Sequence, residues 1–164
     1  MCDYGWLPAN KNILLLQGPL GPFFNRLTKR LEKRGNRVTH VVFNAGDEMY
    51  SRKQNSIPYC GTVAEWPSFF EGLLKDRQID QVYLYGEKRI YHQHATRICR
   101  QQNVDVWVFE EGYIRPNFIT VEKSGVNASS PLSRDPECFF GEAAKINKNE
   151  ERCNPSFLFQ TGWA

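Results

Sequence analysis

The chain has 164 residues and a formal net charge of +3, from 21 lysines and arginines against 18 aspartates and glutamates. With 41% hydrophobic and 24% charged residues its composition is that of a globular domain, which excludes a disordered, collagen-like or coiled-coil chain. Such a small positive charge does not by itself indicate a nucleic-acid binder, and no nucleic-acid partner is expected. The longest apolar run, residues 13–16, is far shorter than the roughly 20 residues of a membrane span.

The N-terminal residues lack the basic and apolar regions of a signal peptide, so a cytoplasmic location is expected. The five cysteines are dispersed and contain no C-x-x-C pair. An odd, scattered set of this kind indicates free thiols in a reducing compartment, and not a disulfide framework or a zinc site. Neither a metal nor a cofactor is expected.

Residues 1–11 are interpreted as an N-terminal extension, after which residues 12–17 form a short apolar strand. Two glycines and two prolines in residues 18–22 end this strand. An apolar stripe at helical spacing follows, and the helix stops at Gly35. A valine-rich strand over residues 37–43 completes a βαβ unit, in which a glycine-rich turn after the first strand is a common place for a ligand.

The alternation then continues along the chain. A long polar loop, residues 44–65, precedes a helix that begins at Trp66. Strands over residues 80–85 and 104–109 flank a helix over residues 91–102. This pattern predicts an α/β fold, a Rossmann-like parallel sheet of four or five strands with helices on both faces.

The pattern weakens in the last third of the chain. Residues 118–121 are a candidate short strand, residues 122–135 a loop, and a helix is expected around residues 138–146. The domain organisation that we predict is therefore a Rossmann-like α/β domain over residues 12–136 and an irregular tail over residues 137–164.

Polar and glycine-rich clusters follow each of the predicted strands. Ligands bind outside the carboxyl ends of the strands in an open parallel sheet, so these loops are expected to converge on one edge. The clusters read QGPLG, NAGD, GEKR with a nearby histidine, and EEGY. The candidate substrate-binding residues of the first three clusters are Gln17, Gly18, Gly21, Asn44, Gly46, Asp47, Arg89 and His92.

The loop of residues 18–21 follows neither the G-x-G-x-x-G pattern of dinucleotide-binding folds nor the P-loop pattern. Its glycines can still let a substrate approach backbone N–H groups at the start of the following helix, which favours an anion. The alternative is a tight turn without a ligand.

Glu110 and Glu111 are adjacent at the end of an apolar strand. Neighbouring carboxylates disfavour each other's ionisation, and burial raises the pKa of a carboxyl group further. A carboxyl group tuned in this way can serve as a general acid or base near neutral pH. The alternative is a solvated acidic turn.

His92 and His94 are two positions apart, so on a helix they point to different sides and cannot form an i, i+4 metal pair. Of the two, His92 lies nearer the strand end and is the better site candidate. A basic face runs along the first helix; such a face is usually solvated, and the alternative is weak attraction to anionic lipid, worth ~1 kcal/mol per residue. Its residues are Arg26, Lys29, Arg30, Lys33, Arg34 and Arg37.

Five segments, taken together and in order, resemble the capsule polysaccharide biosynthesis/export family and most of all its KpsS-type branch. The segments read ILLLQGPLGPFFNRL, FNAGD, YGEKRIYHQHA, VWVFEEGYIRPNFITVEKSGVN and PLSRDP. The similarity extends over about residues 12–136, and its most specific motifs are QGPLGPFF and FEEGYIRP. Within these segments Tyr113, Arg115 and Asn127 are further candidate substrate-binding residues.

The resemblance implies a retaining β-Kdo glycosyltransferase that takes Kdo from CMP-Kdo and builds the Kdo linker on a phosphatidylglycerol-type lipid. It implies a peripheral protein on the cytoplasmic face of the inner membrane, working beside other capsule assembly and export proteins. The implied fold is GT-B-like, with two Rossmann-type domains and the active site between them. The Glu110-Glu111-Gly112 stretch is similar to the acidic motif of bacterial sialyltransferase-like enzymes, which implies Glu111 as the catalytic residue and Glu110 as the second choice.

The chain departs from the family pattern in its length, since full-length members are more than twice as long. A C-terminal nucleotide-binding half with its His-Pro motif has no counterpart here, so we expect a truncated, acceptor-side half that does not catalyse transfer alone. The rival hypothesis is a non-catalytic, single-domain module that binds a lipid or a sugar. An unrelated flavodoxin-like regulator would leave the Glu110–Glu111 pair and the long loop of residues 44–65 unexplained.

Overall fold

The computed structural model describes residues 7–19, 21–51, 55–112 and 118–131, together with Ser133, Asp135 and Glu137. Six strands within them form one sheet in the order β3-β2-β1-β4-β5-β6. The first five strands are parallel, and β6 pairs with β5 in the antiparallel direction. The strands are β1 (Asn12–Leu15), β2 (Arg37–Val42), β3 (Ser56–Pro58), β4 (Gln81–Tyr85), β5 (Asp105–Glu111) and β6 (Ile119–Lys123).

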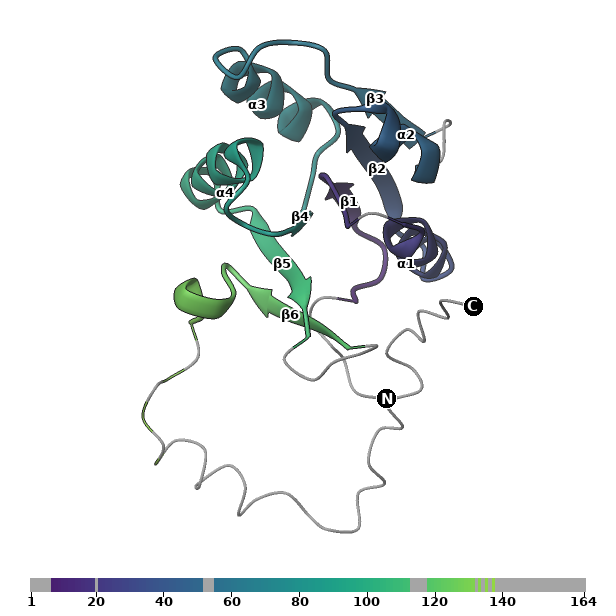
Figure 1. The fold of residues 1–164 in the computed structure, drawn as a ribbon. Coiled ribbons are helices and arrows are strands. Elements are labelled where there is room, and N and C mark those ends of the chain that lie inside the picture. Colours follow the sequence, from purple (N-terminus) through teal and green to yellow (C-terminus); the bar gives the residue numbers. More distant parts are fainter. Residues whose placement is uncertain are drawn as a thin grey trace.

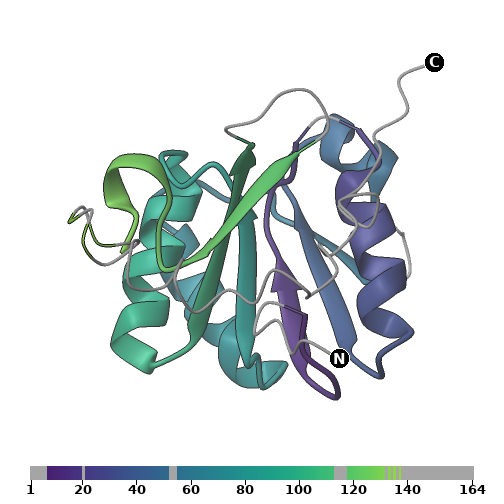
Figure 2. The same cartoon turned by 90° about the horizontal axis from the view of Figure 1, so that it is seen from below.

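Helices cover both faces of this sheet, as Figures 1 and 2 show from two directions. Helix α1 packs on one face, and α3 and α4 pack side by side on the other. This arrangement confirms the expected α/β Rossmann-like fold. The helices are α1 (Phe23–Glu32), α2 (Ala45–Tyr50), α3 (Trp66–Asp76) and α4 (Ile90–Gln102), and a short 3₁₀ turn, η2, spans Asn127–Ser129.

Strand β1 is at the centre of the packing. Its side chains alternate between the two faces, as the pleat of a strand requires. Ile13 and Leu15 join the apolar cluster under α1, whereas Leu14 joins the larger cluster under α3 and α4. All three are fully buried, and each such side chain contributes about 1.5–3 kcal/mol through burial.

Helix α1 follows from the apolar spacing seen in the sequence. Phe23, Phe24, Leu27 and Leu31 are buried along one side of it. Beyond its end, Gly35 has a φ of +81°, the left-handed conformation that glycine adopts without strain. This turn directs the chain into β2, whose first residue pairs with the start of β1.

The long loop predicted over residues 44–65 contains two elements that the sequence did not reveal, and the sheet therefore has six strands instead of four or five. Helix α2 has only six residues, and β3 has three, too few for a periodic pattern to show. The start of α2 is fixed locally, because the Asn44 side chain accepts a hydrogen bond from the Asp47 N–H.

The strand boundaries also differ, most of all in β1, β5 and β6. Strand β1 ends at Leu15 and not at residue 17, because its parallel pairing with β2 and β4 stops there. Strand β5 extends to Glu111, because β6 pairs with it as far as Ile119. The candidate strand over residues 118–121 is this antiparallel β6. The helix expected around residues 138–146 lies outside the described residues.

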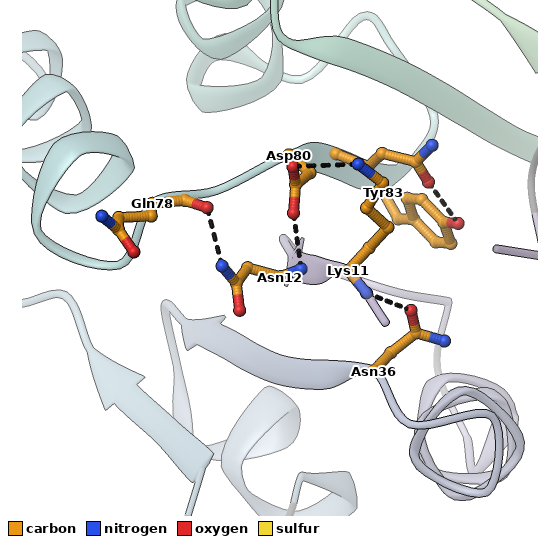
Figure 3. A network of polar contacts seen from close by, with 7 residues as sticks. Lys11, Asn12, Asn36, Gln78, Asp80 and Tyr83 are labelled. Carbon is orange, nitrogen blue, oxygen red and sulfur yellow. Dashed lines mark hydrogen bonds and ion pairs between the residues drawn. The ribbon is translucent and has the colours of Figure 1, made fainter. Parts of the chain in front are cut away.

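The amino edge of the sheet is held by a polar network centred on Asp80 (Figure 3). Its Oδ2 accepts the Asn12 N–H at 2.8 Å, and its Oδ1 pairs with Lys11 Nζ at 3.3 Å. The Asn12 side chain donates to the Gln78 carbonyl at 2.9 Å, and the Lys11 N–H donates to Asn36 Oδ1 at 2.9 Å. The network fixes the start of β1 against the residues that lead into β2 and β4.

We expect Asp80→Asn to lower the free energy of unfolding by about 1–2 kcal/mol, because a charge-assisted hydrogen bond and an ion pair are both weakened. Urea denaturation of the 164-residue chain measures this loss. The matched control is Asp76→Asn, which removes an exposed carboxylate at the end of α3. Equal effects of the two substitutions would contradict the role given to Asp80.

Candidate functional site

The carboxyl edge of the sheet contains the point where the strand order reverses. Strands β1 and β4 are neighbours there, yet the chain leaves β1 toward β2 and leaves β4 toward β5. Loops that leave in opposite directions open a crevice, and ligands of open α/β sheets bind in it. The two loops touch, because Arg89 Nη1 donates to the Gly18 carbonyl at 3.4 Å.

A pocket of about 190 Å³ lies at the ends of β1 and β2, and we call it the β1–β2 pocket. Three of the predicted residues, Gln17, Gly18 and Gly21, line it from the loop that precedes α1. Three more, Asn44, Gly46 and Asp47, line it from the start of α2. Arg89 closes it from the loop before α4.

Hydrogen bonds to the Asp47 carboxylate make one wall of the β1–β2 pocket rigid. Oδ2 accepts from the Phe43 N–H and from Asn44 Nδ2, each at 3.1 Å. Oδ1 accepts from Gln17 Nε2 at 3.3 Å, which ties the end of β1 to α2. Three donors thus hold the carboxylate, whose negative charge faces the pocket.

The glycines of the first loop have distinct reasons to be there. A Cβ on Gly18 would lie 2.8 Å from the Phe24 ring, so the loop can approach α1 only because residue 18 has no side chain. Gly21 has a φ of +115° and nothing within 4 Å of its Cβ position. The loop is therefore a tight turn, and it also leaves open space above the first turn of α1.

A second pocket, of about 380 Å³, lies at the ends of β4 and β5, and we call it the β4–β5 pocket. Gly86, Lys88, Arg89, Glu110 and Asn127 are among its lining residues. Arg89 lines both pockets and so stands on the ridge between them. Both pockets lie at the carboxyl edge, and together they are the candidate site.

Contacts between two loops place Asn127 in the β4–β5 pocket. Glu87 Oε2 accepts the Val126 N–H at 3.4 Å, and Lys88 Nζ donates to Ser129 Oγ at 3.2 Å. Lys88 also pairs with Glu87 at 3.0 Å. These bonds hold η2 against the loop before α4, so a residue far from Arg89 in the sequence shares its pocket.

The two adjacent glutamates lie within β5 and not in a turn after it. Successive strand residues face opposite ways, so only one of them faces the β4–β5 pocket. That residue is Glu110, which lines the pocket. A Cβ atom placed on Gly86 would lie 3.9 Å from Glu110 Oε2 and 3.8 Å from Arg89 Nε. Glu111 is on the opposite face of the strand, the face of Phe109 and α1.

His92 is inside the domain and lines neither pocket. It is 0% exposed, and its ring Nδ1 contacts the Gly86 carbonyl at 2.7 Å. Since a carbonyl only accepts, Nδ1 carries the hydrogen. Burial lowers the pKa of His92 to about 4, so it is neutral at pH 7 and braces the loop before α4. The other candidates, Tyr113 and Arg115, lie outside the described residues.

A residue that the sequence reasoning missed, His40, forms part of the β1–β2 pocket. It is 8% exposed, and its Nε2–H donates to the Leu16 carbonyl at 3.1 Å. Burial lowers its pKa, although the Leu16 carbonyl and the Asp47 carboxylate act in the opposite direction. One signal was available, because a histidine stands among the three valines of β2.

Among the described residues, no helix is long and apolar enough to cross a membrane. The same part of the chain contains no cluster of three or more histidine, cysteine, aspartate or glutamate side chains suited to a metal ion.

Comparisons with known proteins agree on one family. The sequence profile described as "Capsule polysaccharide biosynthesis protein" matches residues 80–161. The capsule polysaccharide export protein KpsS of Escherichia coli is 38% identical over 158 residues, which are 96% of this chain and 41% of that protein. The capsule polysaccharide modification protein LipB of Neisseria meningitidis is 38% identical over 146 residues, 88% of this chain and 35% of that protein. This chain thus spans about two fifths of the length of these relatives.

Similarity to solved structures is weaker. The Bordetella bronchiseptica enzyme WbmH in complex with NAD⁺ has a TM-score of 0.42 and 19% identity, over 57% of this chain and 36% of that one. A Methanococcus jannaschii fibrillarin pre-rRNA processing protein has a TM-score of 0.44 and 12% identity, over 85% and 55%. Neither similarity bears on function.

We expect Gly18→Ala to lower the free energy of unfolding by about 1–3 kcal/mol, because the new methyl group would overlap the Phe24 ring. The matched control is Gly72→Ala within α3, where nothing lies within 4 Å of the added Cβ. Alanine favours a helix, so this control should raise stability by about 0.5–1 kcal/mol. Thermal or urea unfolding compares the two, and effects of the same sign would refute the close approach.

Proposed function

The chain belongs to the capsule polysaccharide biosynthesis protein family, and from this premise we propose that its α/β domain forms one side of the active site of a retaining β-Kdo transferase. The proposed donor is CMP-Kdo, and the proposed product is the Kdo linker on a phosphatidylglycerol-type lipid. The GT-B-like arrangement implied by the family resemblance would place the donor nucleotide on a second Rossmann-type domain, facing the carboxyl edge described above.

The observation that carries this proposal is the setting of Arg89. The guanidinium is half-buried on the ridge between the two pockets, and its hydrogen bond among the described residues is to a neutral carbonyl. No carboxylate of the described residues forms an ion pair with it. A guanidinium is matched in geometry to carboxylate and phosphate. Kdo brings a carboxylate, and the donor and the lipid acceptor bring phosphates.

The acidic pair supplies the second element of the proposal. A carboxyl group near the reacting hydroxyl can take its proton as a general base. Glu110 is positioned for this in the β4–β5 pocket, where it and Arg89 both lie within 4 Å of the Cβ position of Gly86. The anion bound by Arg89 and the proton acceptor would then be neighbours. Glu111, which the family motif favours, is kept in the proposal as the partner of the pair.

The proposed location is the cytoplasmic face of the inner membrane, because the acceptor is a lipid. The exposed basic side chains of α1, Arg26 and Lys29, together with Lys33 directly after it, can add attraction to an anionic lipid surface. Other capsule assembly and export proteins are the proposed neighbours at this surface.

A non-catalytic module that binds a sugar or a lipid headgroup is the second candidate. Pocket size favours it, since ligand pockets usually enclose about 300–1,000 Å³. The two pockets here enclose about 190 and 380 Å³. These volumes suit a single sugar or headgroup, and not a nucleotide sugar bound together with its acceptor. Binding without turnover is the property that separates this candidate from the enzyme half.

We expect the 164-residue chain alone to bind Kdo or phosphate but not to transfer Kdo from CMP-Kdo to a lipid acceptor. The reason is that the proposed donor nucleotide site belongs to a second Rossmann-type domain, whereas the described residues form one α/β sheet with its helices. Product analysis of the chain with CMP-Kdo and a phosphatidylglycerol acceptor tests this. Turnover above that of an Arg89→Gln variant would contradict it.

We expect Glu110→Gln to lower the transfer rate by about 10²–10⁴-fold, the usual contribution of a general acid or base. The assay needs a chimera, in which this chain replaces the matching region of the E. coli relative. Glutamine keeps the size of the side chain and removes the titratable proton. Glu111→Gln should have the smaller effect, because its side chain faces away from the β4–β5 pocket.

The control for both variants is Glu71→Gln on α3, a helix that lies away from both pockets. A larger loss for Glu111→Gln would favour the family motif over the pocket geometry as the guide to the catalytic residue. Full activity of both glutamate variants would remove the pair from the mechanism.

A further inference from the structure

One ring nitrogen of His40 forms a hydrogen bond within the protein, and the other does not. Nε2 donates its hydrogen to the Leu16 carbonyl at 3.1 Å, so in the neutral ring Nδ1 has a free lone pair. No described residue donates to Nδ1. His40 Nδ1 is also not one of the fully buried side-chain atoms that lack a partner. Among the described residues these atoms are Asn25 Oδ1, His92 Nε2, Thr96 Oγ1 and Trp107 Nε1.

The open space next to His40 is the β1–β2 pocket that it lines. An acceptor that borders a pocket and has no internal donor is suited to a ligand that brings its own hydrogen. The rest of the pocket favours the same chemistry. The Asp47 carboxylate and the Arg89 guanidinium both line it, and of these two charges it is Asp47 that acts on the His40 ring. A phosphate or carboxylate beside His40 would therefore meet both the Asp47 charge and the Nδ1 lone pair.

We infer that His40 Nδ1 accepts a hydrogen bond from a hydroxyl group of the ligand. The β1–β2 pocket then binds the polyhydroxylated part of a sugar, and Arg89 binds its anionic part. This division rests on the proposed function, since it assigns the parts of an acidic sugar to two neighbouring positions. His40 is thus a specificity-determining residue, and the hydroxyl hydrogen is what it recognises.

The ring is held so that it can discriminate. The edge of Phe24 packs against it, with ring centroids 6.0 Å apart and planes at 69°. The Leu16 bond fixes the other side. A ligand without the hydroxyl would leave Nδ1 desolvated and unpaired, which is how buried polar groups reject analogues.

Protonation would reverse this recognition, because an Nδ1–H donates and cannot accept. The charged or titratable groups that line the pocket with His40 are Asp47 and Tyr50 from α2 and Arg89 from the loop before α4. The residue after β1 offers a backbone carbonyl, and α1 offers Phe24. Burial keeps the pKa of His40 below its usual 6.5. Sugar affinity should therefore be constant above pH 6.5 and fall as the pH drops through the lowered pKa.

The test uses the full 164-residue chain labelled with ¹⁵N-histidine, whose three histidines can be told apart by substitution. Two-bond ¹H–¹⁵N spectra should show His40 protonated at Nε2 and bare at Nδ1. Free Kdo should move the Nδ1 resonance of His40, whereas inorganic phosphate should not. The resonances of His92, which is sealed in the interior, should stay in place with either probe.

Two substitutions separate the two ring nitrogens. His40→Gln places an amide donor where Nε2 was and removes the acceptor at Nδ1, so Kdo binding should weaken about three- to tenfold with little change in unfolding. His40→Asn places an amide oxygen near the Nδ1 position and loses the Leu16 bond, so unfolding should become easier while Kdo binding is better kept. His94→Gln on α4 is the control and should change neither.

Three results would overturn the inference: an Nδ1-protonated His40 in the free chain, no Kdo-dependent shift at Nδ1, or wild-type Kdo affinity in His40→Gln. The proposed function fails separately. A chimera that shows no Kdo transfer, in the presence of a Kdo-dependent shift at His40, would refute the transferase while it supports the sugar pocket.

Discussion

The structure depends on the parallel pairing of β1 with β2 on one side and with β4 on the other. Strand β1 has only four residues, yet its side chains connect the two apolar clusters that hold α1 on one face and α3 and α4 on the other. Because the strand order reverses beside it, the loops after β1 and β4 leave in opposite directions. One pocket lies on each side of this divergence, and Arg89 lines both.

The two edges of the sheet are built differently. At the amino edge, Asp80 accepts hydrogen bonds from Asn12 and Lys11, and the Asn12 side chain donates to the Gln78 carbonyl. At the carboxyl edge, the Arg89 guanidinium forms no ion pair with the described residues, and the Nδ1 atom of His40 receives no hydrogen from them. Polar groups that are left incomplete in this way are expected at the functional end of a domain.

Much of this could be predicted from the sequence because it rests on local patterns. The apolar stripe of α1 and the glycine-rich loops gave the βαβ order, and the position of the loops after strands gave Gln17, Asn44, Asp47 and Arg89 as neighbours. Helix α2 and β3 could not be predicted, because six and three residues are too short for a period to emerge. The end of β5 could not be predicted either, because it is set by pairing with β6. Such pairing between two segments cannot be seen in the sequence of either one alone.

The candidate site shows the same limit at the level of single residues. The sequence could not decide which of Glu110 and Glu111 faces a pocket, since this depends on whether they belong to a strand or to a turn. His92 was favoured over His94 because it lies nearer a strand end. His40 was not a candidate, yet β2, an interior strand of the sheet, brings it to the β1–β2 pocket. Burial of polar side chains is set by tertiary packing, and a sequence pattern records it only indirectly.

The two buried histidines also link the fold to protons. His40 and His92 are both held in the neutral form by burial, whereas in the unfolded chain each would bind a proton at a pH near 6.5. Below pH 6.5 the unfolded state therefore binds more protons than the folded state. The free energy of unfolding falls as the pH drops below this value. For His92 the fall continues toward pH 4, at about 1 kcal/mol per pH unit. A domain that keeps these rings uncharged for structure and recognition is thereby less stable in acid.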